Sequence, residues 1–429
     1  MSTAELDKVR LAEYQQRQLV ELLRQQLYTL ADPGRFEDLS QALVEAEATL
    51  HEREAVRQAL EQVEKPGLLL DSDRQAGRPG RTIMGADTTG IDAKVLLRMS
   101  HVPTGIVHLF DPTEHPLVTF EVRKAQPGGY VRLRLKSFVE EYSATAVDTV
   151  EIEYSEEPEE IHQLPTFFPE RMRAITELTR ATLHIVIDDL DGATEQESTF
   201  PLWLLARSSA YNARIEDPAK GRWVDLSHFY GAWVTPNAPE ILGLLRRVAD
   251  LHPERAITGY LSRSIDAAAR VQEVEEQVKA VYNALSAEQI LYIRSGLTLG
   301  AGEGESMQRA RLPREVLATK SANCLDGTLL MASVLEAASL NPGLTLVPGH
   351  AFLAWEKQPA GQWQGPGEDR WDYVETTMLS TDSFEAAQVE GRRQASYWLG
   401  KRETMGKPWL FRRLSVAELR TKRGIVPME

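Results

Sequence analysis

The sequence of 429 residues contains a single cysteine, Cys324. One cysteine cannot form an internal disulfide, which excludes the disulfide-stapled class of secreted domains and favours a reducing cytoplasm. Long apolar runs are absent too, because stretches such as "TLHIVI" fall far short of the roughly 20 residues that span a bilayer. The N-terminus, "MSTAELDKVRLAEYQQ", is polar and has no apolar segment of the kind found in secretory signals. We therefore expect a cytoplasmic protein with no membrane partner.

Basic residues are in the minority, with 48 Lys and Arg against 63 Asp and Glu and a net charge of −15. This balance argues against nucleic acid as the main partner. No G-x-x-x-x-G-K-[ST] stretch occurs to cradle a nucleotide phosphate. Eight of the 9 histidines lie scattered before residue 253, away from the cysteine, so no zinc cluster is expected. We predict a protein without a metal or other cofactor.

Residues 1–65 carry a helical pattern, interrupted once by the breaker "ADPG". The apolar positions at helical spacing in its first half are Val9, Leu11, Leu19, Val20, Leu23, Leu27 and Leu30. We predict a helical hairpin or coiled-coil arm. Two roles stay open for it: a solvated packing element of the main body, or an arm for a protein partner or self-association. Residues 66–89, rich in Gly, Pro and Arg, predict a linker.

The remaining chain divides by the period of its apolar residues. Over residues 90–235 the period is two, as in "VRLRLKSFV" and "TVEIEYS", with turn signals between the runs, which predicts an antiparallel β-sandwich. Over residues 236–429 amphipathic helices, such as "SIDAAARVQEVEEQVKAVYNALS", mix with strand patterns. The fold class predicted is therefore α+β with several domains.

The segment "TKSANCLDGTLLMASVLEAA" predicts a helix with Ser321 as its N-cap and Cys324 in its first turn. The unpaired N–H groups and the dipole at a helix start favour a thiolate, which makes the cysteine a candidate nucleophile whose own N–H can bind an oxyanion. A buried, inert cysteine is the alternative, because Cys324 shares one helical face with mostly apolar neighbours. These neighbours are Thr328, Met331 and Leu335.

His350 follows Pro348 and Gly349 in "LTLVPGHAFLAWE", a pattern that places it at a strand start or bulge. A second strand signal, "RWDYVETTM", follows after a loop. If the two strands pair about a loop centred near residue 362 or 363, Glu375 or a close neighbour lies opposite His350, within side-chain reach. Asp372 would face about residue 353 and is the weaker partner. A carboxylate at this place would orient the imidazole and favour its protonated form.

These three blocks, spanning about residues 265–380, resemble the transglutaminase-like branch of the papain-like cysteine proteases. The resemblance rests on a cysteine that opens a helix, a Gly-His-Ala-aromatic strand, and an acid followed by Thr on the next strand. It implies a papain-like α+β fold and acyl transfer through a thioester, with Cys324 as nucleophile, His350 as base and Glu375 as the third member. Two features depart from the family pattern: Glu replaces the usual Asp, and the interval from Cys to His is short.

Weaker candidates surround the motif. Tyr292 stands where the family often has a side chain that completes the oxyanion site, although a core tyrosine is the alternative. Asn323 and Asp326 are expected to cap the helix or to complement its dipole. The basic segment "RARLPREVLATK" (309–320) is expected to form a solvated loop, with binding of an acidic substrate as the alternative. The expected function is a thiol-dependent hydrolase, a peptidase or isopeptidase acting on a protein or peptide. The alternatives are a cross-linking acyltransferase and a non-catalytic scaffold.

Overall fold

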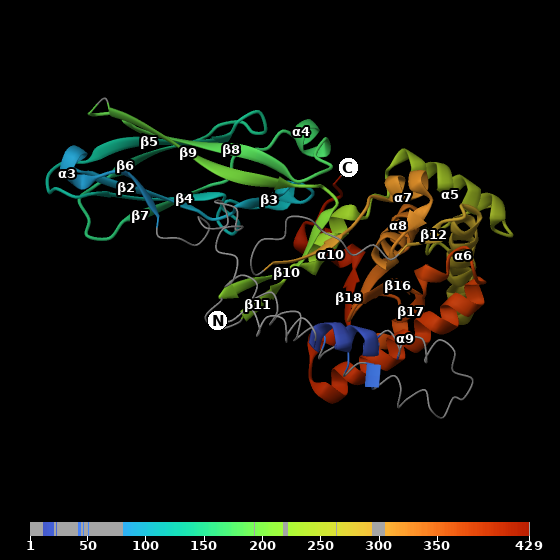
Figure 1. Cartoon of the computed structure of the whole chain (residues 1–429). Helices are drawn as coiled ribbons and strands as arrows, with labels where there is room; N and C mark the ends of the chain where they lie inside the picture. The colour runs from blue at the N-terminus through green and yellow to red at the C-terminus, as the bar shows by residue number, and fades with distance from the viewer. Residues whose placement is uncertain are drawn as a thin grey trace. The chain divides into compact units, whose positions relative to one another are not determined.

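The structure is a computed structural model, and the chain divides into two units, Met1–Gln75 and Ala76–Glu429. In the first unit it describes residues 12–20, 23, 42–43, 46 and 50, and in the second residues 80–428 without 193, 218–221, 263 and 294–304. The described part is α+β and contains several sheets. The helices and strands of the second unit are shown in Figure 1.

The first part of the second unit consists of two sheets. One has the strand order β1 (Arg81–Met84), β2 (Ile91–Leu97), β4 (Val118–Lys124), β7 (Glu159–Gln163). The other has the order β3 (His101–Pro103), β9 (Thr194–Leu205), β8 (Thr179–Asp189), β5 (Val131–Val139), β6 (Ala146–Ile152). Neighbouring strands are antiparallel except for β3 and β9, which are parallel. Short helices connect them: α3 (Ala86–Thr89), η2 (Val107–Leu109) and α4 (Pro169–Arg173).

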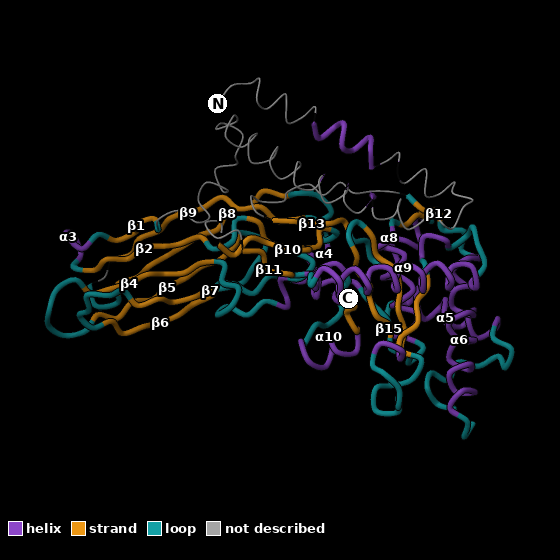
Figure 2. Tube along the Cα trace, turned by 90° about the horizontal axis from the view of Figure 1, so that it is seen from below, coloured by secondary structure: helices purple, strands orange, loops and turns teal. Residues whose placement is uncertain are grey.

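The alternation seen in the sequence places one face of each strand in a common core. β5 alternates buried and less buried residues along its length, and its apolar residues pack with those of β2, β4, β8 and β9. The layer with β5, β8 and β9 faces the layer with β2, β4 and β7 (Figure 1), and in the view of Figure 2 the strands run side by side. The two sheets therefore form a β-sandwich.

The predicted boundaries of this domain are wrong at both ends. Part of the predicted linker, 66–89, is strand β1 and helix α3, while residues 66–79 lie outside the described chain. At the other end, β10 (Ser209–Asp217) pairs with β11 (Arg222–Asp225) and with the distant β13 (Glu305–Arg309) in a separate sheet. The following η3 (Ser227–Trp233) packs in the core of the C-terminal part. Period two indicates strands but not which sheet they join.

The C-terminal part combines a sheet of order β17 (Trp371–Val374), β16 (His350–Glu356), β15 (Pro342–Val347), β18 (Arg412–Ser415) with helices. Those helices are α5 (Pro239–Leu251), α6 (Ala267–Ala287), α7 (Pro313–Thr319), α8 (Cys324–Ala337), α9 (Phe384–Met405) and α10 (Val416–Arg423). Shorter elements are β12 (Leu291–Tyr292), β14 (Ser321–Ala322), η4 (Glu368–Arg370), η5 (Thr376–Met378) and η6 (Pro408–Leu410).

Helix α8 is the central element of this part. Every residue from Cys324 to Leu335 is buried, because α8 packs on β15 and β16 and is covered by α5, α6 and α7. Figure 2 shows the helices gathered around this sheet. A helix that is apolar on all sides belongs in a core, and its N-terminus is consequently held in a fixed place.

The N-terminal unit is described at few positions, and all of them are helical. Val20 and Leu23 pack against Ala46, and Gln16 Nε2 donates a hydrogen bond to the Ala46 carbonyl at 2.9 Å. Two helical segments of the predicted arm, 1–65, are thus in contact. The rest of that prediction lies outside the described residues.

Candidate active site

Cys324 is the first residue of α8, and the helix begins two residues later than predicted. Asn323, not Ser321, is the N-cap: its Oδ1 accepts the Asp326 N–H at 2.8 Å, and Asp326 Oδ2 accepts the Asn323 N–H at 3.1 Å. Ser321 is instead part of β14, which pairs with β12. Asn323 and Asp326 therefore act as the helix caps that the sequence led us to expect.

An arginine that the sequence placed in a solvated loop stabilises this helix start. Asp326 is fully buried and accepts hydrogen bonds from the backbone N–H and Nε of Arg311 at 2.8 and 3.0 Å. Burial raises the pKa of Asp326, and the hydrogen bonds and charge of Arg311 oppose that rise. The predicted loop 309–320 also contains α7. Through Arg311 this segment stabilises the start of α8.

His350 is the first residue of β16, as the pattern around Pro348 and Gly349 predicted. The two strands pair up to Val347 and His350, which leaves Pro348 and Gly349 as a two-residue turn. Gly349 has a φ of 69°, in the left-handed region that favours glycine, and proline suits the position before it. The turn therefore presents the imidazole at the end of the sheet.

Glu375 lies beside His350, although the predicted register is off by two residues. Glu375 Oε2 is 2.7 Å from His350 Nε2. Leu353 pairs with Val374 and Trp355 with Asp372, so the position opposite Glu375 is that of Phe352. His350 and Glu375 are still in contact because His350 and Phe352, two residues apart on β16, have side chains on the same face. Glu375 is therefore a diagonal neighbour of His350.

Asp372, the weaker candidate, has another partner. Its carboxylate accepts two hydrogen bonds from Arg392 of α9, at 2.7 and 2.6 Å. Glu375 is buried, and its second oxygen accepts the N–H and hydroxyl of Thr377 at 2.9 and 2.8 Å. The carboxylate of Glu375 is thus fully hydrogen-bonded and held toward the imidazole.

Thr376 ties the end of β17 to the start of α8. Its hydroxyl lies 3.1 Å from that of Thr328 and 3.4 Å from the carbonyl oxygen of Cys324, which also accepts from Thr328 at 2.8 Å. A Cβ on Gly327 would meet Thr376 at 3.3 Å, so the glycine permits this close approach. The contact keeps Cys324 near the residue that follows Glu375.

Cys324 lies close enough to His350 to contribute to the raised pKa of the imidazole. Since His350 Nε2 faces Glu375, Nδ1 is the ring nitrogen left for the thiol. Burial lowers the pKa of His350, but the charge of Glu375 and the hydrogen bonds to both neighbours raise it to about 10. Burial likewise raises the pKa of Glu375, and the His350 charge and hydrogen bonds lower it overall. The three residues form an interaction chain in which the imidazole is cationic at neutral pH.

Tyr292 is not a core residue, because 49% of it is exposed. It lies in β12 opposite Ala322 of β14, two residues before Cys324. The sequence-predicted site residues Cys324, His350, Glu375 and Tyr292 therefore come from one end of the C-terminal part. Arg311 and Thr376 were missed as supporting residues, although the acid-Thr pattern pointed to the second.

A cavity lies away from this group. Its volume is about 520 Å³, and it is lined by residues around Phe110, Phe167, Arg207 and Met428, none of which belongs to this group. Within the described ranges, no cluster of three or more His, Cys, Asp or Glu side chains is arranged to hold a metal ion. No described helix has the length and apolar character needed to cross a membrane. The Cys324 group contains a thiol, a cationic imidazole and a buried carboxylate, with the imidazole between the other two.

No protein-family model matches the chain, and no curated protein matches it.

Replacing Glu375 by Gln is expected to lower the pKa of His350 well below 10. The substitution keeps the shape but removes the carboxylate charge, the main cause that opposes burial. A histidine-selective ¹H–¹⁵N NMR titration, assigned with His350→Ala, measures this change. Asp372→Asn is the control, and we expect it to leave the titration of His350 in place. An unchanged titration in Glu375→Gln would contradict the assignment.

Proposed function

We propose that the chain is a thiol-dependent hydrolase, a peptidase or isopeptidase, with a transglutaminase-like catalytic domain in residues 236–429. The observation that supports this proposal is the arrangement of three side chains. Cys324 lies at a helix start, His350 interacts with it, and the buried Glu375 contacts His350. Nucleophile, base and orienting acid in this order are the parts of a cysteine acyl-transfer site. The substrate is a protein or peptide amide, and no cofactor is required.

The residues supply each step of the reaction. The thiolate of Cys324 attacks the amide carbonyl carbon, forming a C–S bond while the carbonyl π electrons move to oxygen. His350 donates its proton to the leaving nitrogen as the C–N bond breaks, which leaves a thioester and a free amine. Water then gives a proton to His350 and attacks the thioester, releasing a carboxylic acid and restoring the Cys324 thiolate beside the cationic imidazole. Glu375 orients the imidazole and stabilises its cationic form throughout.

Three further proposals accompany the hydrolase, and the first of them uses the same site. If an acceptor amine replaces water in the last step, the enzyme is an acyltransferase that cross-links amines to acyl groups. Residues 1–65 are proposed as the region for a protein partner or self-association, because helical segments of this arm pack together. We place the protein in the cytoplasm, where its single thiol stays reduced.

A non-catalytic scaffold is the second candidate function. The observation that favours it is the low exposure of Cys324, at 9%, inside the apolar core. A buried thiol of this kind behaves as a small apolar side chain. The chain would then present its sandwich and helical arm to partners without turnover.

Alkylation with iodoacetamide separates enzyme from scaffold. Because Cys324 is the only cysteine, intact mass reports on this residue alone. We expect the wild type to react near neutral pH roughly 10- to 30-fold faster than a free thiol, of which only a few per cent is thiolate. His350→Ala removes the cationic partner and should return the rate toward that of a free thiol. His184→Ala, in β8 of the sandwich, is the matched control and should leave the rate unchanged.

Two results would reject the enzyme: no adduct until the protein is unfolded, or equal rates for wild type and His350→Ala. Turnover is followed with p-nitrophenyl acetate, with Cys324→Ala as background. Adding methylamine then distinguishes the two chemistries. N-methylacetamide as the main product supports acyl transfer, and acetate supports hydrolysis.

A further inference from the structure

A cavity of about 520 Å³ lies where the sandwich meets the C-terminal part of the same unit. Its walls come from the segments that follow β3 and β7, from helix α4, from Arg207 and from the end of the chain at Met428. Helix α4 lies at the end of the sandwich opposite α3 (Figure 1). Sites for small molecules usually have volumes of about 300–1,000 Å³ and are found preferentially at domain interfaces. The cavity therefore has the size and the location of a small-molecule site.

Most of the cavity wall is apolar. Val107, Phe167 and Met172 are buried residues of the sandwich core. Phe110 and Met428 also line the cavity and pack against the core of the C-terminal part. Apolar side chains are more stable in contact with an apolar molecule than with water. A ligand that suits this cavity therefore has an apolar body.

The cavity is accessible from solvent. Pro112, Thr166 and Arg173 line it and are exposed, whereas Thr104 and Arg207 line it and are buried. The lining residues thus extend from the surface of the molecule into its interior. A small molecule can enter without opening the fold.

The charged groups of the wall are all of one sign. The titratable side chains among its described residues are His108, Arg173 and Arg207, with no Asp or Glu, although the chain has 63 acidic and 48 basic residues. Arg207 is 6% exposed, and its charge is offset by an ion pair with Glu315 of α7. The Arg173 side chain, in contrast, has no hydrogen-bond acceptor or ion-pair partner among the described residues. An anionic group is the complement that this wall lacks.

The inner wall is fixed by backbone hydrogen bonds. The Arg207 N–H donates to the Ile175 carbonyl at 3.0 Å, and the Met428 N–H donates to the Ala232 carbonyl at 2.8 Å. A Cβ added to Gly105 would lie 3.0 Å from the Met428 side chain, so that side chain packs closely on the backbone. A site that is already formed requires little ordering when a ligand binds.

We propose that this cavity is a second site of the protein, which binds a small apolar carboxylate. The apolar body of the ligand contacts Phe110, Phe167 and Met172, and its carboxylate accepts hydrogen bonds from the Arg173 guanidinium. Arginine binds carboxylates through short, charge-assisted hydrogen bonds, often two at once. The site does not depend on the chemistry of Cys324, so binding is expected whether or not the thiol is reactive.

The test uses decanoate as the probe and the methionine methyl groups of the full chain as reporters. Met172 and Met428 line the cavity, whereas Met331 is fully buried in α8 and serves as the internal reference. In ¹H–¹³C NMR of methyl-labelled protein, assigned with Met172→Leu and Met428→Leu, decanoate should shift the first two signals saturably and leave Met331 in place. Decanamide, which is neutral and of equal length, should bind about 10-fold more weakly, because it forms no charge-assisted pair.

Two arginines of one short helix provide the matched variants. Arg173→Gln should weaken decanoate binding by about 10-fold and change decanamide binding by less than about 2-fold, since only the charged ligand loses an ionic hydrogen bond. Arg171 is also exposed and lies in α4, but it is not among the described lining residues. Arg171→Gln should therefore leave both affinities unchanged. Both variants should unfold at the urea concentration of wild type, because surface substitutions of this kind have small effects.

Four outcomes would overturn the proposal. Absence of a saturable shift at Met172 and Met428 removes the site. Equal affinities for decanoate and decanamide leave an apolar cavity with no preference for a carboxylate. Equal losses in Arg171→Gln and Arg173→Gln mean that general surface charge, not a contact with Arg173, attracts the anion. Loss of decanoate binding in Cys324→Ala would place the ligand at the thiol, whereas unchanged binding there supports a separate site.

Discussion

Replacing Arg311 by Ala is expected to lower the free energy of unfolding by about 3–5 kcal/mol, the usual cost of leaving one member of a buried ion pair uncompensated. Asp326 is fully buried, and the Arg311 side chain is its cationic partner, with Nη2 2.9 Å from Oδ2. Arg311 also donates to the hydroxyls of Thr319 and Ser321 at 3.2 and 3.1 Å. The substitution therefore removes the hydrogen bonds to the segment before α8 and also leaves the Asp326 carboxylate without its cationic partner. Urea unfolding measures the change.

The loss should depend on pH in a defined direction. Burial already raises the pKa of Asp326, and removing the Arg311 charge raises it further. A carboxyl group with a raised folded-state pKa destabilises the fold above that pKa and ceases to do so when protonated. The deficit of Arg311→Ala should therefore be smaller at pH 4 than at pH 8. A deficit that grows toward low pH would contradict this account.

A double substitution and a neighbouring control sharpen the Arg311 result. Asp326→Asn removes the buried charge, so Arg311→Ala combined with Asp326→Asn should recover part of the lost stability. Arg309 is exposed, and Arg309→Ala should change stability by less than about 0.5 kcal/mol. Equal losses for Arg309→Ala and Arg311→Ala would show that the ion pair is not the cause.

Gly391→Ala is the other substitution with a large expected effect, a loss of about 3 kcal/mol. An added Cβ would lie 2.7 Å from the backbone nitrogen of Val374 and 2.8 Å from the carbonyl carbon of Tyr373. These are backbone atoms of β17, which cannot rotate away, so α9 must shift. The Ala387 carbonyl of α9 accepts the Glu375 N–H at 2.9 Å. The same substitution should therefore also slow alkylation of Cys324.

Gly400 in the same helix is the matched control. No atom lies within 4 Å of a Cβ added there. Alanine is the better helix former, so Gly400→Ala should raise the free energy of unfolding by about 0.5–1 kcal/mol. Opposite signs for the two variants in urea unfolding are the expected result. A similar loss in both would mean that α9 tolerates neither methyl group for reasons unrelated to β17.

Local sequence patterns predicted much of the secondary structure near the site. Pro348 and Gly349 suit a two-residue turn, so the strand start at His350 follows from backbone preferences alone. The segment around Cys324 predicted a helix, and its N-cap was misplaced by two residues. That error arose because Ser321, a good cap by residue type, is used in strand pairing with β12. A tertiary contact thus overrode a local preference.

The pairing of His350 with Glu375 was expected from an approximate register that was wrong by two residues. The error kept Glu375 on the correct face, because side chains on a strand repeat every second residue. An error of one residue would have turned the carboxylate away. The sequence limits which face a residue occupies more strongly than which residue it pairs with.

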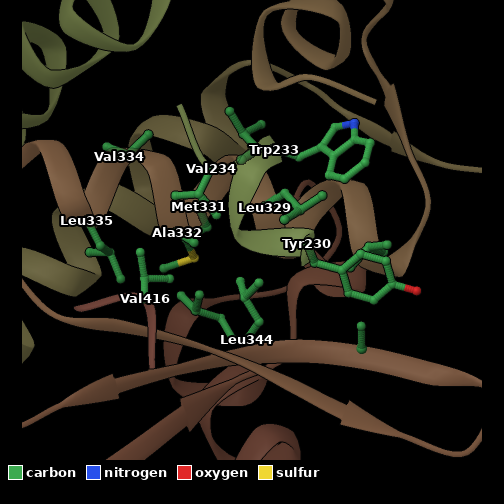
Figure 3. Close-up of a cluster of buried hydrophobic side chains, with 14 of the residues drawn as sticks. Tyr230, Trp233, Val234, Leu329, Met331, Ala332, Val334, Leu335, Leu344 and Val416 are labelled. Atoms are coloured by element: carbon green, nitrogen blue, oxygen red, sulfur yellow. The ribbon is translucent and has the colours of Figure 1, made fainter. Parts of the chain in front are cut away.

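The sequence by itself determined the mixed α and β composition, the alternating strands of the sandwich, the helix that begins near Cys324, and the turn before His350. These features depend on residues close together in the chain. Only the tertiary structure decided that β10 joins β13, that Arg311 neutralises Asp326, and that Tyr230 is buried in the C-terminal core. Tyr230 and Cys324 are far apart in sequence, and no local period encodes which distant side chains share a core. Both residues belong to one buried apolar cluster, part of which is shown in Figure 3, and burial of apolar surface, not a sequence motif, selects its members.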